Sequence, residues 1–376
     1  MTQTADVIVI GGGIHGCSTA LHLAMRGLKP ILVEKDYAGR HASGVNAGGV
    51  RQLARDLAEI PLSISSMEIW EHIEELVGDD CGFSSHGTVL VAETDDELAS
   101  FKARVDDLRL RGFVHEELID QAELRRLVPA VSEHCPGGVV SRRDGAADPF
   151  RATQAFRRKA VEMGAEIIEG VTVTGLQRVG DVWRVETSDG PIEAPKVVNA
   201  AGAWADRIAA MLGEPVPLTV VAPMLMVTSR VPAFIDPVVI LRGRKLSFKQ
   251  LANGTVVIGG GHLATPYRDR NETVLDWDKL AISARTVWEL FPVMREATIV
   301  RAWAGIEAYM PDGIPVVGKS STSEGVFHQF GFSTHGFQLG PGTGAMMAEL
   351  VATGSTNVPI DGLEIERFSR QAARQS

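Results

Sequence analysis

The stretch that decides the fold reads Ala5-Asp6-Val7-Ile8-Val9-Ile10-Gly11-Gly12-Gly13-Ile14-His15-Gly16. Its apolar run at residues 6–10 predicts a buried parallel strand, and residues 17–26 predict a helix behind a glycine turn. In a G-x-G-x-x-G turn, Gly11 makes the tight bend and Gly13 lets the backbone approach a pyrophosphate, while Gly16 lets the helix pack on the strand. The helix start also offers free N–H groups and positive potential to phosphates. The stretch therefore predicts a dinucleotide site.

A second apolar run supports this prediction. Residues 31–33 predict the next parallel strand, which is followed by Glu34 and Lys35. A carboxylate at this position accepts hydrogen bonds from ribose hydroxyls, and a free 2′-hydroxyl implies FAD or NAD rather than NADP. Because strand, turn, helix, strand and acid follow in order, we expect a functional site rather than a glycine-rich turn without a ligand.

Composition bounds the remaining possibilities. The 376 residues suffice for two domains or one large composite, and the hydrophobic content of 45% supports a sizeable core. A net charge of −10 argues against partners such as nucleic acid or an anionic membrane surface. The three widely spaced cysteines predict neither a disulfide framework nor a metal site. With no signal-peptide pattern and no run of about 18 apolar residues, we expect no membrane span and a cytoplasmic location.

Helices and strands are predicted along the whole chain. Residues 40–50 are polar and glycine-rich, as expected of a loop over a ligand. Apolar periodicity predicts helices at 60–77, 95–111, 121–127, 151–163, 275–291 and 345–352. Strands are predicted at 87–92, 138–141, 166–173, 182–187, 192–198, 218–228, 238–241, 246–250, 256–260 and 299–305.

Two later segments repeat the chemistry of the first turn. One reads Val197-Val198-Asn199-Ala200-Ala201-Gly202-Ala203-Trp204, again a strand, a small-residue turn and a helix. It predicts a second close approach of backbone to the cofactor. The other, residues 330–344, is glycine-rich and precedes the helix predicted at 345–352. That helix start could hold negative charge near a reduced flavin, and the alternative is a helix entered through a flexible loop.

Together these motifs resemble the D-amino-acid oxidase-like FAD enzymes over nearly the whole chain. The resemblance rests on the first turn with Glu34, on residues 147–150, 199–202, 311–318 and 332–344. Within the family the chain is most similar to the sarcosine oxidase branch, and residues 254–261 resemble β subunits of heteromeric sarcosine oxidases and of D-hydroxyproline or proline dehydrogenases.

The resemblance implies an α/β fold of mixed type. A Rossmann-type FAD-binding domain would be interleaved with a substrate domain built on a mostly antiparallel sheet. The FAD domain would comprise residues 1–80, 146–215 and 301–376, and the substrate domain 81–145 and 216–300.

The implied reaction is oxidation of an amine beside a carboxylate, by hydride transfer from the α-carbon to flavin N5 to give an imine. The leading hypothesis is a dehydrogenase or oxidase of a secondary or cyclic amino acid, such as sarcosine-like glycines or isomers of proline and hydroxyproline. Three alternatives stay open: a broad D-amino-acid dehydrogenase, a 2-hydroxy-acid dehydrogenase, and an FAD subunit active only within a larger electron-transfer complex. The expected partners are the amino-acid substrate, an electron acceptor (oxygen, quinone or a carrier) and, for the last alternative, a partner subunit.

At several positions the sequence differs from its family relatives, and these differences affect the expected flavin attachment, electron acceptor and carboxylate-binding residue. Monomeric sarcosine oxidase attaches its flavin through a cysteine where this chain has Gly305, so we expect non-covalent FAD. Its oxygen-activating lysine corresponds to Ile258, which favours a dehydrogenase. The carboxylate-binding arginines of glycine oxidase-like relatives correspond to Glu307 and Thr334. Arg51 is then the candidate for the substrate carboxylate, its alternative being a surface arginine at a helix start.

Other site residues follow from family position. His335 is expected to make a polar contact near the flavin, Tyr309 to orient the substrate, and His262 to line the substrate cavity; for each, a packed side chain is the alternative. Residues 43–48 would approach the pyrophosphate or isoalloxazine, and residues 336–339 would form a loop bracketing the flavin. The residues expected to bind FAD are Gly11, Gly13, Ile14, His15, Gly16, Glu34, Lys35, Ser43, Asn46, Ala47, Gly48, Val173, Ala201, Gly202, Trp204, Gly305, Gly336, Phe337, Gln338 and Leu339.

Overall fold

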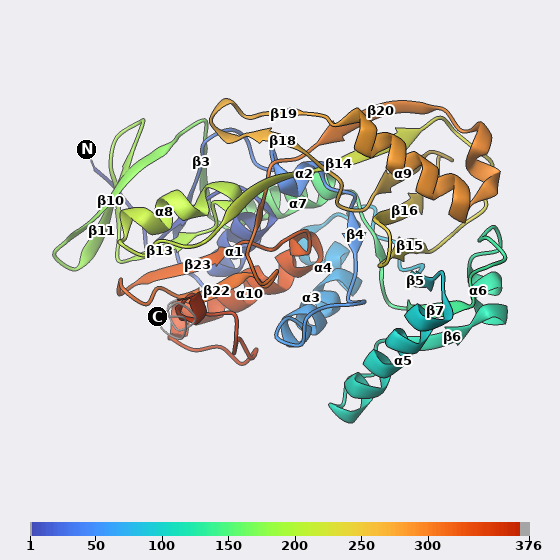
Figure 1. The fold of residues 1–376 in the computed structure, drawn as a ribbon. Coiled ribbons are helices and arrows are strands. Elements are labelled where there is room, and N and C mark those ends of the chain that lie inside the picture. The colour runs from blue at the N-terminus through green and yellow to red at the C-terminus, as the bar shows by residue number, and fades with distance from the viewer. Residues whose placement is uncertain (1, 369–376) are drawn as a thin grey trace, which may run out of the picture.

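The N-terminal stretch forms the predicted strand–turn–helix unit in the computed structural model, which describes residues 2–368 (Figure 1). Strand β2 (Val7–Ile10) is buried along its whole length and leads into helix α1 (Ile14–Met25). Strand β3 (Pro30–Glu34) returns parallel to β2. Gly11 has a φ of +111°, a conformation open to glycine, which permits the sharp turn between strand and helix.

These strands belong to a six-stranded sheet, called here the nucleotide-binding sheet. Its order is β22-β23-β13-β2-β3-β9, and only β22 runs antiparallel to its neighbour. The additional strands are β9 (Glu166–Glu169), β13 (Lys196–Asn199), β22 (Val316–Lys319) and β23 (Val326–Phe330). On one face α1 packs against α7 (Pro149–Glu162) and α10 (Gly336–Thr353), and α10 packs against α3 (Ile60–Glu71), which precedes α4 (Ile73–Val77).

A four-stranded sheet covers the opposite face. Val7 and Val9 contact the helical core, whereas Ile8 and Ile10 contact the core of this second sheet, as strand alternation requires. Its order is β1-β12-β11-β10, with bounds Gln3–Thr4, Ile192–Ala194, Val182–Thr187 and Val173–Val179. The 3-10 helix η1 (Gly202–Trp204) and helix α8 (Ala205–Met211) follow β13. Burial on both faces explains why β2 is apolar throughout.

The other end of the molecule contains an eleven-stranded sheet, called here the large sheet (Figure 1). Its order is β19-β18-β14-β17-β16-β15-β5-β7-β6, and β20 and β21 also pair with β14. Within the described residues, β15 and β5 pair in parallel, and the other pairings of this sheet are antiparallel. The strands are β5 (Thr88–Ala92), β6 (Glu117–Asp120), β7 (Gly137–Ser141), β14 (Thr219–Thr228), β15 (Val238–Leu241), β16 (Leu246–Gln250), β17 (Val256–Gly259), β18 (Leu263–Tyr267), β19 (Glu272–Val274), β20 (Ile299–Ala304) and β21 (Glu307–Tyr309).

Short elements complete the chain. Helices α5 (Asp95–Leu110) and α6 (Gln121–Leu127) confirm the two helices predicted from periodicity. They begin at the side-chain caps Thr94 and Asp120. Helix α9 (Trp277–Leu290) begins at the cap Asp276 and packs against β16. The 3-10 helices η2 and η3 span Arg268–Arg270 and Pro292–Glu296. Within residues 2–368, no helix has both the length and the apolar character that a membrane crossing needs.

Several predicted bounds were wrong. The loop expected at 40–50 contains helix α2 (Ala42–Val45) and strand β4 (Gly49–Val50), which pairs with β8 (Gly145–Ala146). The strand expected at 192–198 divides at Pro195, which has no N–H for the ladder, and its halves join different sheets. The strand expected at 166–173 likewise ends before Gly170, whose φ is +77°. Helix α10 starts at Gly336, nine residues before the predicted 345, so residues 336–339 are helix and not a loop.

Candidate active site

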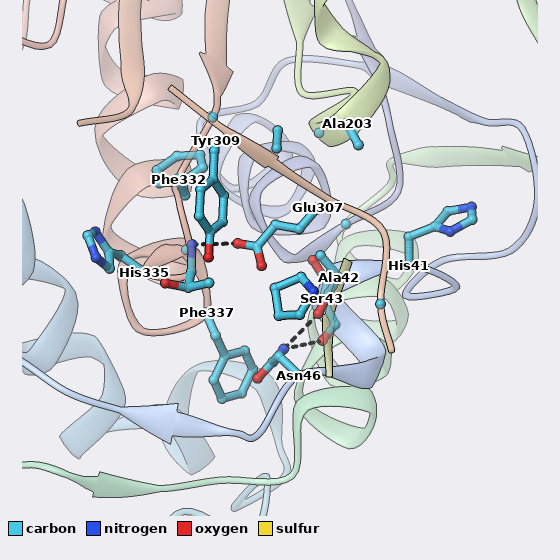
Figure 2. A pocket seen from close by; sticks show the side chains of 18 of the residues that line it. His41, Ala42, Ser43, Asn46, Ala203, Glu307, Tyr309, Phe332, His335 and Phe337 are labelled. Carbon is cyan, nitrogen blue, oxygen red and sulfur yellow. Dashed lines mark hydrogen bonds between the residues drawn. The ribbon is translucent and has the colours of Figure 1, made fainter. Parts of the chain in front are cut away.

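A cavity of about 990 Å³ lies between the nucleotide-binding sheet and the large sheet. Its wall includes the turn after β2, the segment 39–56, the end of β3, the turn after β13, strand β21 and the segment 329–337. Figure 2 shows part of this wall, with Glu307 and Tyr309 directed into the same space as Asn46 and Phe337. The carboxyl ends of β2, β3 and β13 therefore open toward the large sheet, where ligands of open parallel sheets bind.

The first glycine turn forms a cradle in which side chains have no room. A Cβ at Gly11 would collide with the carbonyl oxygen of Ala200, and one at Gly16 would collide with the carbonyl oxygen of Gly11. Glu34 reaches this turn from β3, and its Oε2 accepts the Gly12 N–H at 2.6 Å. Burial raises the pKa of Glu34, while the N–H groups of Gly12 and Asp36 act in the opposite direction. This bare backbone beside a carboxylate fits the phosphates and ribose of a dinucleotide.

Helix α2 closes over that cradle. Ser43 Oγ accepts the N–H of Ile14 at 3.0 Å, so α2 is tied to the first turn of α1. Asn46 donates from Nδ2 to the carbonyls of Ala42 and Ser43 at 2.9 and 3.1 Å (Figure 2), and its Oδ1 accepts the Gly48 N–H at 2.7 Å. Asn46 therefore shapes the segment that lines the cavity.

A polar group of side chains lies at the end of β3. Lys35 Nζ lies 4.0 Å from the ring centroid of Trp204 and donates to Asn271 Oδ1 at 2.8 Å. The His41 ring lies 4.5 Å from the Trp204 ring, and its Nε2 is 3.1 Å from Asp36 Oδ2. Asn271 comes from the connection between β18 and β19, so these contacts join the large sheet to the nucleotide-binding sheet beside the cavity.

Strand β21 presents an acid and a phenol to the cavity. Glu307 Oε1 accepts the backbone N–H of Thr334 at 2.6 Å (Figure 2). Burial raises the pKa of Glu307 to about 7, against the effect of that hydrogen bond. Burial and the neighbouring Glu307 raise the pKa of Tyr309 to about 12. Ser333 and Thr334 have φ values of 47° and 72°, which are costly for residues with side chains and mark a strained loop.

Two arginines line the cavity from the segment after β4. Arg55 is only 2% exposed, and its Nη2 donates to the carbonyls of Arg51 at 2.6 Å and of His335 at 3.5 Å. Its Nε and Nη1 have no hydrogen-bond partner within residues 2–368. Arg51 donates from Nη1 to the carbonyl of Leu53. Burial lowers the pKa of both guanidinium groups.

Arg55 was missed by the sequence analysis, which selected Arg51 by family position. The sequence does show a second arginine, Arg55, four residues after Arg51 in the same segment. Arg55 is buried against residues distant in the sequence, such as His335, whose carbonyl it contacts, and no local pattern reveals this.

Most residues predicted to hold FAD or substrate meet at this cavity. Those that line it are Gly11, Gly13, His15, Glu34, Lys35, Ser43, Asn46, Ala47, Arg51, Val173, Ala201, Gly202, Trp204, Gly305, Tyr309, His335, Gly336 and Phe337. Those outside its lining, within the described residues, are Ile14, Gly16, Gly48, His262, Gln338 and Leu339.

The structure explains why several of the predicted residues lie outside the cavity lining. Gln338 is fully buried against α3, where its side chain bonds to Ser63 at 3.0 and 2.9 Å. Ile14 and Leu339 belong to the hydrophobic core, and Gly16 contacts the turn instead of the cavity. His262 contributes a backbone carbonyl that accepts the Met224 N–H at 2.7 Å.

His335 lines the cavity, but its ring points away from Glu307 (Figure 2). Its Nδ1 lies 3.2 Å from the Oε1 of Glu59. Burial lowers the pKa of His335 against the opposing effect of Glu59. Among residues 2–368 no cluster of histidine, cysteine and acidic side chains could hold a metal ion.

Comparison with known proteins agrees with this geometry. The family model for FAD-dependent oxidoreductases of the DAO type matches residues 6–350. Sarcosine oxidase subunit beta of Rhodobacter capsulatus is 28% identical over 93% of this chain and 85% of its own. Mitochondrial sarcosine dehydrogenase of Mus musculus is 29% identical over 98% of this chain, which spans only 42% of that protein.

Solved structures share the fold. L-proline dehydrogenase from P. horikoshii superimposes with a TM-score of 0.92 at 29% identity, covering 99% of both chains. Glycine oxidase from Geobacillus kaustophilus gives a TM-score of 0.88 at 23% identity, covering 97% of this chain and 99% of its own. The chain therefore belongs to the DAO family of FAD-dependent oxidoreductases, with FAD as its cofactor.

Proposed function

We propose that the chain oxidises the C–N bond of a secondary or cyclic amino acid, with sarcosine-like glycines and isomers of proline or hydroxyproline as the substrate class. The observation that carries the proposal is Arg55, a buried guanidinium at the cavity wall with two nitrogen donors, Nε and Nη1, that have no hydrogen-bond partner in the described part of the chain. A buried cation of this kind needs an anionic partner, and a carboxylate matches its planar fork. The names of the relatives, which include sarcosine oxidase subunit beta and L-proline dehydrogenase, point to the same class.

The chain's own residues have distinct proposed tasks. The cradle at Gly11, Gly13 and Gly16 holds the pyrophosphate, and Glu34 accepts hydrogen bonds from the adenosine ribose. Arg55, with Arg51 beside it, anchors the substrate carboxylate, which orients the α-carbon. Bound FAD supplies the acceptor for the hydride that leaves that carbon, and the amino acid becomes an imine. Tyr309 borders the space for the substrate side chain.

FAD is proposed to bind without a covalent link. The family position for a cysteinyl attachment is Gly305, where a Cβ would collide with Cγ2 of Val45. We also propose the division into an FAD domain (1–80, 146–215, 301–376) and a substrate domain (81–145, 216–300). Within residues 301–376, strand β21 and most of β20 nevertheless pair with β14 in the large sheet.

A second candidate function is that of an FAD subunit active only with a partner chain, which the name of the R. capsulatus subunit favours. Ile258, at the position of the oxygen-activating lysine, supports a dehydrogenase that passes electrons to a carrier or partner. Turnover by the isolated chain with an artificial acceptor distinguishes the two candidates.

The test is anaerobic bleaching of the flavin's visible absorbance by a panel of amino and hydroxy acids. The panel comprises proline and hydroxyproline isomers, sarcosine, D-amino acids and 2-hydroxy acids. We expect rapid bleaching by one group of secondary or cyclic amino acids and none by the hydroxy acids. Bleaching by D-amino acids or hydroxy acids alone would contradict the proposed substrate class. Admitting air afterwards separates an oxidase, which recovers its colour quickly, from a dehydrogenase.

A further inference from the structure

Glu307 differs from the other acids that line the cavity. Glu34 accepts two backbone N–H groups, Glu59 faces His335, and Asp312 pairs with Arg367. Asp56 is exposed to solvent, and its Oδ1 accepts the Ala58 N–H. Glu307 is half-buried and accepts a single hydrogen bond, from the Thr334 N–H to Oε1. Within residues 2–368 it has no cationic partner, so its Oε2 is available to the cavity.

The backbone holds this carboxyl group in a defined place. The Ser333 N–H donates to the carbonyl of Ala308 at 3.2 Å, and the Ser333 Oγ accepts the Met310 N–H at 3.1 Å. Through these two bonds, Ser333 holds the loop against the end of β21, at Ala308 and Met310. The left-handed conformation of Thr334 then directs its N–H to Glu307. Strain that a structure retains in this way is typical of a functional site.

The same loop also holds the opposite charge. The carbonyl of His335, the residue after Thr334, accepts a hydrogen bond from Arg55 Nη2. One loop thus contacts the cavity's unpaired carboxyl group through one residue and its unpaired guanidinium group through the next. An amino acid carries a cationic nitrogen and an anionic carboxylate on one carbon, and this pair of charges is complementary to it.

We propose that Glu307 binds the amino group of the substrate and accepts its ammonium proton, while Arg55 binds the carboxylate. The inference rests on the proposed oxidation of an amino acid. In the step, an N–H bond of the ammonium breaks, an O–H bond forms at Glu307 Oε2, and the electron pair stays on nitrogen. That lone pair is what the amine needs before it can release a hydride from the neighbouring carbon.

Burial in the cavity makes the Glu307 carboxylate a better proton acceptor. With its pKa raised to about 7, Glu307 is a stronger base than an ordinary glutamate and is ionised in mildly alkaline solution. The titratable and charged groups that line the cavity with it include Tyr309 on its own strand, and Arg51 and Arg55 on the segment after β4. His335 on the loop also lines the cavity, but its ring points away from Glu307 and lies beside Glu59. The pKa of Tyr309 lies near 12, and burial holds the pKa of His335 below its usual value.

The charge contact is tested by calorimetry with two non-reacting probes of one shape. Glycine betaine carries a quaternary nitrogen without a lone pair, and 3,3-dimethylbutanoate has carbon in its place. We expect the wild-type holoenzyme at about pH 8 to bind betaine at least tenfold more tightly than its carbon analogue, which keeps the carboxylate but lacks the positive charge. Glu307→Gln should remove this preference while retaining FAD and its affinity for the carbon analogue. The matched control is Glu272→Gln on β19, an acid exposed on another part of the large sheet, which should behave as wild type.

Proton acceptance is tested by the rate of flavin reduction, and the ionisation of Glu307 by the pH dependence of betaine binding. With the amino acid that bleaches the wild-type flavin fastest, Glu307→Gln should slow reduction about a hundredfold at pH 7. The wild-type preference for betaine should grow between about pH 6 and pH 8 as Glu307 ionises, and the variant should show no such growth.

Distinct outcomes separate the two proposals. If no amino acid bleaches the wild-type flavin, the proposed function fails, whatever the calorimetry shows. If amino acids bleach it but betaine and its carbon analogue bind wild type equally, or Glu307→Gln keeps the preference for betaine, the role of Glu307 is wrong. An unchanged reduction rate in Glu307→Gln would contradict proton acceptance.

Discussion

At the scale of single residues, the decisive feature is a buried guanidinium group that has no salt bridge within residues 2–368. Glu59 and Asp144 favour its charged form only from a distance. Arg55 loses its hydration in the cavity wall, yet two of its donors find no partner within residues 2–368. An arrangement of this kind is destabilising for the protein alone and is relieved when an anion binds. Arg51 lies beside it, but its Nη1 already donates a hydrogen bond to the Leu53 carbonyl. The two arginines are therefore unequal candidates for the same carboxylate.

Replacing each arginine by methionine compares them. Because Arg55→Met removes the unpaired donors, we expect kcat/KM to fall by about 30- to 1000-fold, or about 2–4 kcal/mol, mainly through a higher KM. Arg51→Met should have a smaller effect. Steady-state kinetics with an artificial acceptor measures both, and the flavin absorbance of the purified variants checks that FAD is retained. An equal loss in both variants, or a larger loss in Arg51→Met, would reverse the assignment.

At the scale of elements, α10 and α3 explain how a helix can contain the run Gly340-Pro341-Gly342. Proline offers no N–H to the helix, which weakens the backbone bonding of that turn. Ser66 on α3 compensates: its Oγ donates to the carbonyl of Gln338 at 2.5 Å and accepts the N–H of Gly342 at 3.0 Å. Helix α10 can thus begin at Gly336, where its N-terminus borders the cavity.

Removing this hydroxyl should loosen the helix pair. We expect Ser66→Ala to lower the free energy of unfolding by about 1–3 kcal/mol, because both groups are buried and lose a partner. The control is Ser65→Ala, at a neighbouring position of α3 whose hydroxyl makes no hydrogen bond within residues 2–368. Urea unfolding of the holoproteins gives the comparison. Equal midpoints for the two variants would show that Ser66 does not support α10.

At the scale of the whole molecule, the cavity is a gap between two sheets that FAD would fill. Its wall draws residues from the nucleotide-binding sheet and the large sheet, and direct links such as Lys35 to Asn271 lie along its edge. A ligand that contacts both sheets binds the folded state and not the unfolded chain. By mass action it stabilises the fold.

FAD should therefore raise the midpoint of thermal unfolding of the stripped protein. A hundredfold excess over the dissociation constant corresponds to about 2.7 kcal/mol. FMN, which lacks the adenosine half that Glu34 and the glycine turn would hold, should give a much smaller shift at equal concentration. Differential scanning fluorimetry across a concentration series measures both ligands. Equal shifts from FMN and FAD would show that the glycine turn contributes little to binding.

Local order made much of the fold predictable. Strand β2, its glycine turn and α1 depend on short-range rules of periodicity and backbone freedom, and strands such as β15 and β16 were predicted with the right bounds. The prediction was wrong where a distant partner decides the outcome. The start of α10 depends on Ser66, and the break at Pro195 depends on which sheet each half joins.

By itself, the sequence determined the family, the cofactor class and the position of the dinucleotide turn, because glycines and a carboxylate at fixed spacing act through backbone geometry close to them. Only the tertiary structure decided which charges face the substrate. Arg55 and Glu307 lie 252 positions apart, since their numbers are 55 and 307 in the chain, and meet on one loop through Thr334 and His335. Burial and pairing are properties of that assembled cavity, so no local pattern could distinguish these two residues from ordinary surface charges.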